Sequence, residues 1–142
     1  GRLRRNFQGF TDDTSEILIG LGASAISQFP DLLIQNEKNA GRYRMLALAG
    51  RLPAVRGVVR SPDDQLRGRI IEDLLCRGTA ETGTIGTAAV RERLHAFEER
   101  GLLRWTGASL ALSPDALPYA RTIAAAFDAW RQPGIRQFSN AV

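Results

Sequence analysis

The apolar run over residues 16–28 most constrains what this chain can fold into. Polar residues 14–15 precede it and residues 29–30, Phe-Pro, follow it. A run of this length predicts a strand buried on both faces, as in a parallel sheet or a barrel. Gly20 and Gly22 interrupt it, and glycines inside a strand indicate close approach by another backbone or by a ligand. Tight packing and ligand contact both explain these two glycines.

The length of 142 residues allows one domain, or a domain with a remnant of another, and is too short for a complete barrel enzyme. The chain is 44% apolar and 24% charged, which is typical of a soluble globular protein. No run approaches the roughly 20 apolar residues of a membrane span. Residues 1–5 are basic but lack the apolar core of a secretory leader. We therefore expect a cytoplasmic protein without a membrane role.

Cys76 is the one cysteine, so the sequence excludes an internal disulfide framework. It cannot by itself hold an iron–sulfur cluster, because such clusters take several thiolates. Its place near the end of an amphipathic segment favours a packed hydrophobe over a reactive thiol. His95 is the one histidine and has no second ligand at helical spacing, so no metal site is predicted.

The second half of the chain begins with the helix-start signal Ser-Pro-Asp-Asp at residues 61–64. We predict short elements before it, namely a strand over 32–36, a helix over 40–49 and an extended segment over 55–60. After it, the sequence predicts a helix ending at Gly78, a loop over 79–87, a helix over 88–100, a hairpin over 102–112 and a last long helix whose apolar stripe includes Leu117, Ile123, Phe127 and Trp130. The predicted fold class is α+β and mainly helical, with residues 1–60 and 61–142 as separate regions. The order in the second region is that of a winged-helix-like unit.

A winged helix suggests a free-standing DNA-binding or protein-interaction module as an alternative function. Arg91, Arg93 and His95 would read base edges from the helix over 88–100. Acidic residues on the same helix, Glu92, Glu98 and Glu99, would repel phosphate, so nucleic acid is not the preferred partner despite a formal charge of +4. Trp105 and Trp130 lie on apolar stripes, which favours core packing over base stacking.

A second motif precedes the apolar run. Residues 5–11 read R-N-F-Q-G-F-T, and residues 18–27 read L-I-G-L-G-A-S-A-I-S. Together they resemble the signature near the end of the catalytic domain of oxygen-independent coproporphyrinogen III oxidase, R-N-F-Q-G-Y-T-T followed by L-x-G-x-G-x-S-A-I-S. This chain departs from that pattern at Phe10 and Asp12. The resemblance continues in order along nearly the whole chain and is weakest between residues 77 and 101, where this chain is shorter than the family usually is.

This resemblance implies the C-terminal portion of a radical S-adenosylmethionine (SAM) enzyme of haem biosynthesis. Residues 1–60 would be the end of its barrel, and residues 61–142 a winged-helix-like domain covering the barrel mouth. An upstream barrel would carry a three-cysteine motif, a 4Fe–4S cluster and two molecules of SAM. The whole enzyme would convert two propionates of coproporphyrinogen III to vinyl groups with loss of carbon dioxide, giving protoporphyrinogen IX. This chain alone is expected to be inactive and to bind no cofactor.

Two site residues follow from the resemblance by motif position. Gln8 would be a polar residue of the active-site region, and Ile26 would contact SAM. The amide of Gln8 can donate and accept hydrogen bonds, and the Ile26 side chain can pack against an adenine face. Strand-end capping and plain core packing are the alternatives. Arg2, Arg4 and Arg5 would either meet propionates or form a solvated chain start. As a free strand, the apolar run would favour self-association.

Overall fold

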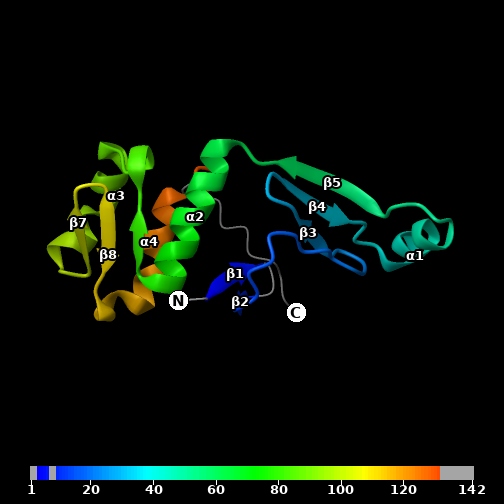
Figure 1. Cartoon of the computed structure of the whole chain (residues 1–142), viewed down its shortest axis with the longest axis horizontal. Helices are drawn as coiled ribbons and strands as arrows, with labels where there is room; N and C mark the ends of the chain where they lie inside the picture. The colour runs from blue at the N-terminus through cyan, green and yellow to red at the C-terminus, as the bar shows by residue number, and fades with distance from the viewer. Residues whose placement is uncertain (1–2, 7–8, 132–142) are drawn as a thin grey trace. The chain divides into compact units, whose positions relative to one another are not determined.

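The computed structural model describes residues 3–6 and 9–131. The described chain is α+β, with four α-helices and several small antiparallel sheets (Figure 1). It divides into two compact units, Gly1–Leu66 and Arg67–Val142, with the division inside a helix. No helix in the described ranges has both the length and the apolar character needed to span a membrane.

The first unit contains two small sheets. β1 (Arg4–Asn6) pairs antiparallel with β2 (Gly9–Thr11), with Arg5 opposite Phe10. β3 (Ile26–Gln28), β4 (Leu32–Asn36) and β5 (Ala54–Val59) form an antiparallel sheet in chain order (Figure 1). α1 (Ala40–Leu48) connects β4 to β5 and begins where the Asn39 side chain accepts a hydrogen bond from the Arg42 amide. The strand, helix and extended segment predicted after residue 30 are confirmed.

The predicted strand over residues 16–28 is wrong over most of its length. Only Ile26–Gln28 is a strand, Leu18 forms one isolated bridge with Gln28, and the sheet is antiparallel rather than parallel. The cause is a chain reversal, because Gly22 and Ser24 have φ values of +107° and +62°. An extended strand cannot pass through such residues. The apolar run therefore folds back on itself, and its first half is not buried on both faces.

The second unit is organised by two helices and a sheet. α2 (Pro62–Arg77) is followed by β6 (Thr79–Glu81), the 3₁₀ turn η1 (Gly83–Ile85) and α3 (Ala88–Glu99). β7 (Leu103–Thr106) and β8 (Ser109–Leu112) form the predicted hairpin, and β8 lies between β7 and β6 in the sheet. The core contains large, fully buried side chains from several of these elements, namely Ile70, Leu74, Leu94, Leu110, Ile123 and Phe127.

Two secondary-structure predictions in the second unit are wrong. The predicted loop over 79–87 contains β6, where Ala80 is buried and lies opposite Leu110. A strand of three residues has no periodicity of its own, since its partner comes about thirty residues later in the chain. The predicted last long helix is instead three short pieces: η2 (Pro114–Tyr119), α4 (Ala120–Ala124) and η3 (Ala125–Phe127).

Pro118 lies inside η2, where it removes a backbone donor and prevents a regular α-helix. Ile123 and Phe127 are buried as predicted. Leu117 and Trp130 are 74% and 79% exposed, so their predicted place on the buried stripe is wrong. The break in the helix changes the side on which these residues lie, and the 3.6-residue period no longer applies across it.

Candidate functional site

Residues 18–25, which we call the glycine loop, are held by several side-chain hydrogen bonds to their backbone. Asn36, at the end of β4, is 8% exposed. Its side-chain amide donates to the carbonyl oxygens of Gly20 and Gly22, at 3.1 and 3.0 Å. One buried side chain therefore holds two points of the loop.

Two hydroxyl groups complete the contacts. The Gly20 amide donates to Oγ of Ser27, and the Gly22 amide donates to the hydroxyl of Tyr43, both at 3.0 Å. Side chains from β3, β4 and α1 thus satisfy both polar backbone groups of both glycines. The loop is fixed through its backbone. The amide and carbonyl groups of both glycines already hydrogen-bond to side chains of this chain.

Gly20 also lies directly against Ile26. A Cβ atom at Gly20 would be 2.6 Å from the carbonyl oxygen of Ile26 and 2.9 Å from its nitrogen, closer than any real side chain comes. The expected close backbone approach at this glycine is confirmed. Ile26 is half-buried at the start of β3, where it pairs with Gln35. Its position is set by the sheet on one side and by Gly20 on another.

The outward side of this region is apolar. Ile17, Ile19 and Leu21 are 54%, 60% and 85% exposed, and they alternate along the chain with the inward-held Leu18 and Gly20. The loop therefore combines a polar attachment to the protein with an apolar outer face. Such a face can contact a flat apolar group or another protein surface.

The other motif, around residues 5–11, is described in part. Gln8 lies outside the described residues, so its predicted role remains a prediction. Arg4 is half-buried and Arg5 exposed on β1, and Phe10 is 56% exposed on β2.

A turn follows this motif at Asp13 and Ser15. The hydroxyl and backbone amide of Ser15 hydrogen-bond to Asp13 and hold the pKa of that carboxyl below its ordinary value of 3.8.

The arginines of α3 bind within the second unit. The Arg91 guanidinium stacks on the Trp105 ring at 4.0 Å from its centre and donates to the carbonyl oxygens of Gly86 and Gly107. Trp105 itself is half-buried, and His95 is exposed, with its Nε2 3.4 Å from the Glu99 carboxylate. Arg91 is therefore used to hold the β7–β8 turn, which weakens its predicted role as a base reader.

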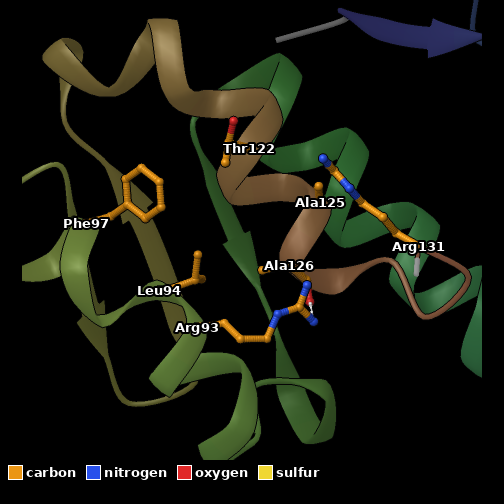
Figure 2. Close-up of a pocket in the computed structure, with 7 residues that line it drawn as sticks. All are labelled: Arg93, Leu94, Phe97, Thr122, Ala125, Ala126 and Arg131. Carbon is orange, nitrogen blue, oxygen red and sulfur yellow. Dashed lines mark hydrogen bonds between the residues drawn. The ribbon is translucent and has the colours of Figure 1, made fainter. Parts of the chain in front are cut away.

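A pocket of about 260 Å³ lies beside α3 in the second unit (Figure 2). Leu94 and Phe97 of α3 and Ala125 and Ala126 of η3 give it an apolar lining, and its polar residues are Arg93, Thr122 and Arg131. The Arg93 guanidinium donates to the Ala126 carbonyl at 3.0 Å, as the dashed line in Figure 2 shows. Arg93 therefore binds a backbone carbonyl of η3. Like Arg91, it uses its guanidinium in a contact within the protein.

The residues of this chain do not fit an iron–sulfur cluster. Cys76 is the sole cysteine of the sequence and is half-buried on α2. Within residues 3–6 and 9–131, no three His, Cys, Asp or Glu side chains come together as metal ligands. The thiolates of any cluster would have to come from another part of a longer polypeptide.

Sequence reasoning missed Asn36, Ser27 and Tyr43 as the residues that hold the glycine loop. One signal was present for Asn36, because asparagine is disfavoured in strands and this one ends a mostly apolar strand, Leu32–Asn36. Such a residue needs a specific hydrogen-bonding role. No comparable signal marks Ser27 or Tyr43, whose partners are distant in sequence.

No model of a known protein family matches the chain. Relatives do match it: oxygen-independent coproporphyrinogen III oxidase from Bradyrhizobium diazoefficiens is 40% identical, over 99% of this chain and 33% of that protein. The enzyme of the same name from Cereibacter sphaeroides is 40% identical over 94% of this chain and 32% of that protein. The chain thus spans about one third of the length of these relatives.

A solved structure of a coproporphyrinogen III oxidase is also similar to this chain. Coproporphyrinogen III oxidase from Escherichia coli, described as a radical SAM enzyme, has a TM-score of 0.79 and 26% identity over 91% of this chain and 32% of that one. These comparisons favour the predicted resemblance over a free-standing DNA-binding module. Along almost its whole length, the chain is similar to oxygen-independent coproporphyrinogen III oxidases, and it matches about one third of the length of those enzymes.

Proposed function

We propose that this chain is the C-terminal portion of an enzyme that converts coproporphyrinogen III to protoporphyrinogen IX. The observation that carries the proposal is the 40% identity to a coproporphyrinogen III oxidase over 99% of the chain. The reaction removes carbon dioxide and hydrogen from two propionates and leaves two vinyl groups. SAM and a 4Fe–4S cluster, when bound to the whole enzyme, would supply the radical that oxidises each propionate. We place this reaction in the cytoplasm.

Ile26 and Gln8 are the residues of this chain that we assign to the site. Support for Ile26 comes from its fixed backbone and from an apolar side chain that is half-buried, which leaves a surface for the adenine of SAM. Gln8 carries an amide in a family signature, so it would hydrogen-bond a carboxylate or amino group in the active-site region. The chain's own contribution is therefore binding and orientation.

Residues 1–60 would be the end of the catalytic barrel domain. Among the described residues of the first unit, the two buried side chains are Ser27 and Asn36, and both are polar. A separate domain of this size would bury an apolar core. Large apolar side chains are instead exposed, including Leu21, Leu48 and Leu52 at 85%, 77% and 87%. The remaining two thirds of the polypeptide, which the relatives possess, would cover this surface.

Residues 61–142 would be a winged-helix-like domain that covers the barrel mouth and helps to exclude water. The order of helix, strand, 3₁₀ turn, helix and two-stranded hairpin supports this interpretation, with η1 in place of a middle helix. The sheet order β6-β8-β7 places the first strand beside the last, which a simple meander would not. A fold of this kind carries no function by itself. Its role here is proposed from the family.

An anaerobic turnover assay tests the proposal. The natural polypeptide that carries this chain would be incubated with SAM, a reductant and coproporphyrinogen III, and its products separated by mass. We expect protoporphyrinogen IX and two molecules of carbon dioxide per substrate. Gln8→Ala should lower turnover with the cluster absorbance unchanged. An enzyme with a complete cluster and SAM that leaves coproporphyrinogen III unaltered would contradict the proposal.

A further inference from the structure

We infer that Asn36 is a positioning residue for SAM. By fixing the glycine loop against the backbone of Ile26, it sets the place of the side chain that would contact SAM. This inference rests on the proposed function, because it assigns to Asn36 the task of orienting a residue of that site. Asn36 itself does not contact the cofactor in this scheme.

The chemistry of the contacts is specific to asparagine. Both N–H groups of the Asn36 amide are used, one on the Gly20 carbonyl and one on the Gly22 carbonyl. Aspartate has the same shape without donors, leucine has neither donor nor acceptor, and glutamine places its donors one methylene further out. A buried amide that satisfies two loop carbonyls at once cannot be replaced without loosening the loop.

The contacts reach Ile26 from two directions. The Asn36 backbone amide donates to the carbonyl of Ala25 at 2.9 Å, immediately before Ile26. The Asn36 side chain holds Gly20, whose Cα lies so close to Ile26 that an added Cβ would be 2.7 Å from the Ile26 carbonyl carbon. A shift of Gly20 would therefore be transmitted to the main chain of Ile26.

The burial of two polar side chains, Ser27 and Asn36, indicates that their hydrogen bonds maintain the conformation of the glycine loop. Ser27 and Asn36 are the buried side chains of the first unit's described part, and both hydrogen-bond to Gly20. Apolar packing would stabilise a small unit with less desolvation cost than buried polar groups do. Polar groups at these positions are better explained by the need for one defined loop conformation.

Steady-state kinetics of the natural polypeptide tests the inference. Asn36→Ala should raise the KM for SAM about tenfold, as expected from the loss of two hydrogen bonds. The KM for coproporphyrinogen III should stay within about twofold, because Ile26 is proposed to contact SAM and not the porphyrinogen. A general loss of folding would instead lower the apparent kcat without raising the KM for SAM alone. Gln35→Ala is the matched control. It removes a solvent-exposed hydrogen bond of 3.2 Å from the half-buried neighbour of Asn36 to the Ser24 carbonyl, and should leave the KM for SAM within about twofold.

If the alanine variant does not fold, Asn36→Gln provides a second test of the inference. It retains both donors but displaces them, so we expect a folded protein with a raised KM for SAM and faster amide exchange at Gly20 and Gly22. An unchanged KM for SAM in a folded Asn36 variant would overturn the inference.

Ile26→Ala separates failure of the inference from failure of the proposed function. A raised KM for SAM with Ile26→Ala and an unchanged one with Asn36→Ala would overturn the role of Asn36 alone. An unchanged KM for SAM with Ile26→Ala would overturn the assignment of Ile26 and with it the positioning role. Absence of turnover by the wild-type enzyme would contradict the proposed function itself.

Discussion

At the scale of single residues, Gly20 shows why a glycine is needed at one position of an apolar run. The sequence predicted a close approach at this position but left the approaching group open. The structure identifies it as the backbone of Ile26, which a side chain at Gly20 would have to displace. Backbone atoms of a paired strand cannot move aside as a flexible side chain can.

Gly20→Ala should therefore destabilise the glycine loop. We expect the free energy of local opening at the Gly22 amide to fall by about 1–3 kcal/mol, as overpacking usually costs. Hydrogen exchange of the natural polypeptide measures it. Gly57→Ala is the control, because a Cβ there would meet its nearest atom at 3.7 Å, an ordinary contact. Equal opening energies in the two variants would show that the backbone of Ile26 gives way to the added methyl group at no cost.

Asp13 provides a prediction about pH. The Ser15 hydroxyl and amide favour the charged carboxylate, so its pKa lies below 3.8, and the turn they form is complete above that value. The turn is lost as the pH falls through the lowered pKa in the folded protein. A carboxyl-carbon NMR titration should give a midpoint below 3.8, and Ser15→Ala should raise it. A midpoint that Ser15→Ala leaves in place would exclude the hydroxyl as a cause.

At the scale of elements, local signals predicted the helices better than the strands. Ser-Pro-Asp-Asp at residues 61–64 predicted the start of α2, and Gly78 its end. These are caps, whose chemistry is local. β6 could not be found in this way, because what makes Ala80 part of a strand is its pairing with Leu110. The same limit hid the contacts of Asn36 with the glycine loop, since they join segments that are distant in sequence.

Arg91 joins α3 to the β7–β8 turn, so its replacement should weaken that pair of elements. Arg91→Lys loses the stacked guanidinium on Trp105 and at least one bond to a turn carbonyl. We expect a loss of about 1–2 kcal/mol in the free energy of unfolding, measured in urea by tryptophan fluorescence. Arg104→Lys, an exposed change on β7, should have almost no effect. An equal effect of both substitutions would exclude the stacking contact as the cause.

At the scale of the whole molecule, the two units differ in how they are stabilised. The second unit holds the apolar core of the described chain, with Phe127 and Leu110 fully buried. The first unit exposes Val55, Val58 and Val59 on β5, which pairs with β4 alone among the described strands. This contrast supports the proposal that the first unit is part of a larger catalytic domain. The apolar run at residues 16–28 pointed toward such a domain, although its conformation was predicted wrongly.

An open strand edge with exposed apolar residues favours self-association of the isolated chain. We expect the 142-residue chain to form dimers or larger species at high concentration, as measured by light scattering. Val58→Lys on β5 should reduce association, because an edge lysine opposes strand pairing. Leu48→Lys, a change at a more exposed position on α1, should reduce it less. A monomer at all concentrations would contradict this expectation.

Hydrogen exchange in two molecular contexts tests most directly whether the first unit is an incomplete part of a larger domain. The amides of β3, β4 and β5 would be compared between the isolated chain and the natural polypeptide that carries it. We expect fast exchange of these amides in the isolated chain, slow exchange of those in α2 and α3, and strong protection of all of them in the natural polypeptide. Equal protection of β3, β4 and β5 in both contexts would mean that the first unit is complete by itself, and would contradict its assignment as the end of a catalytic barrel.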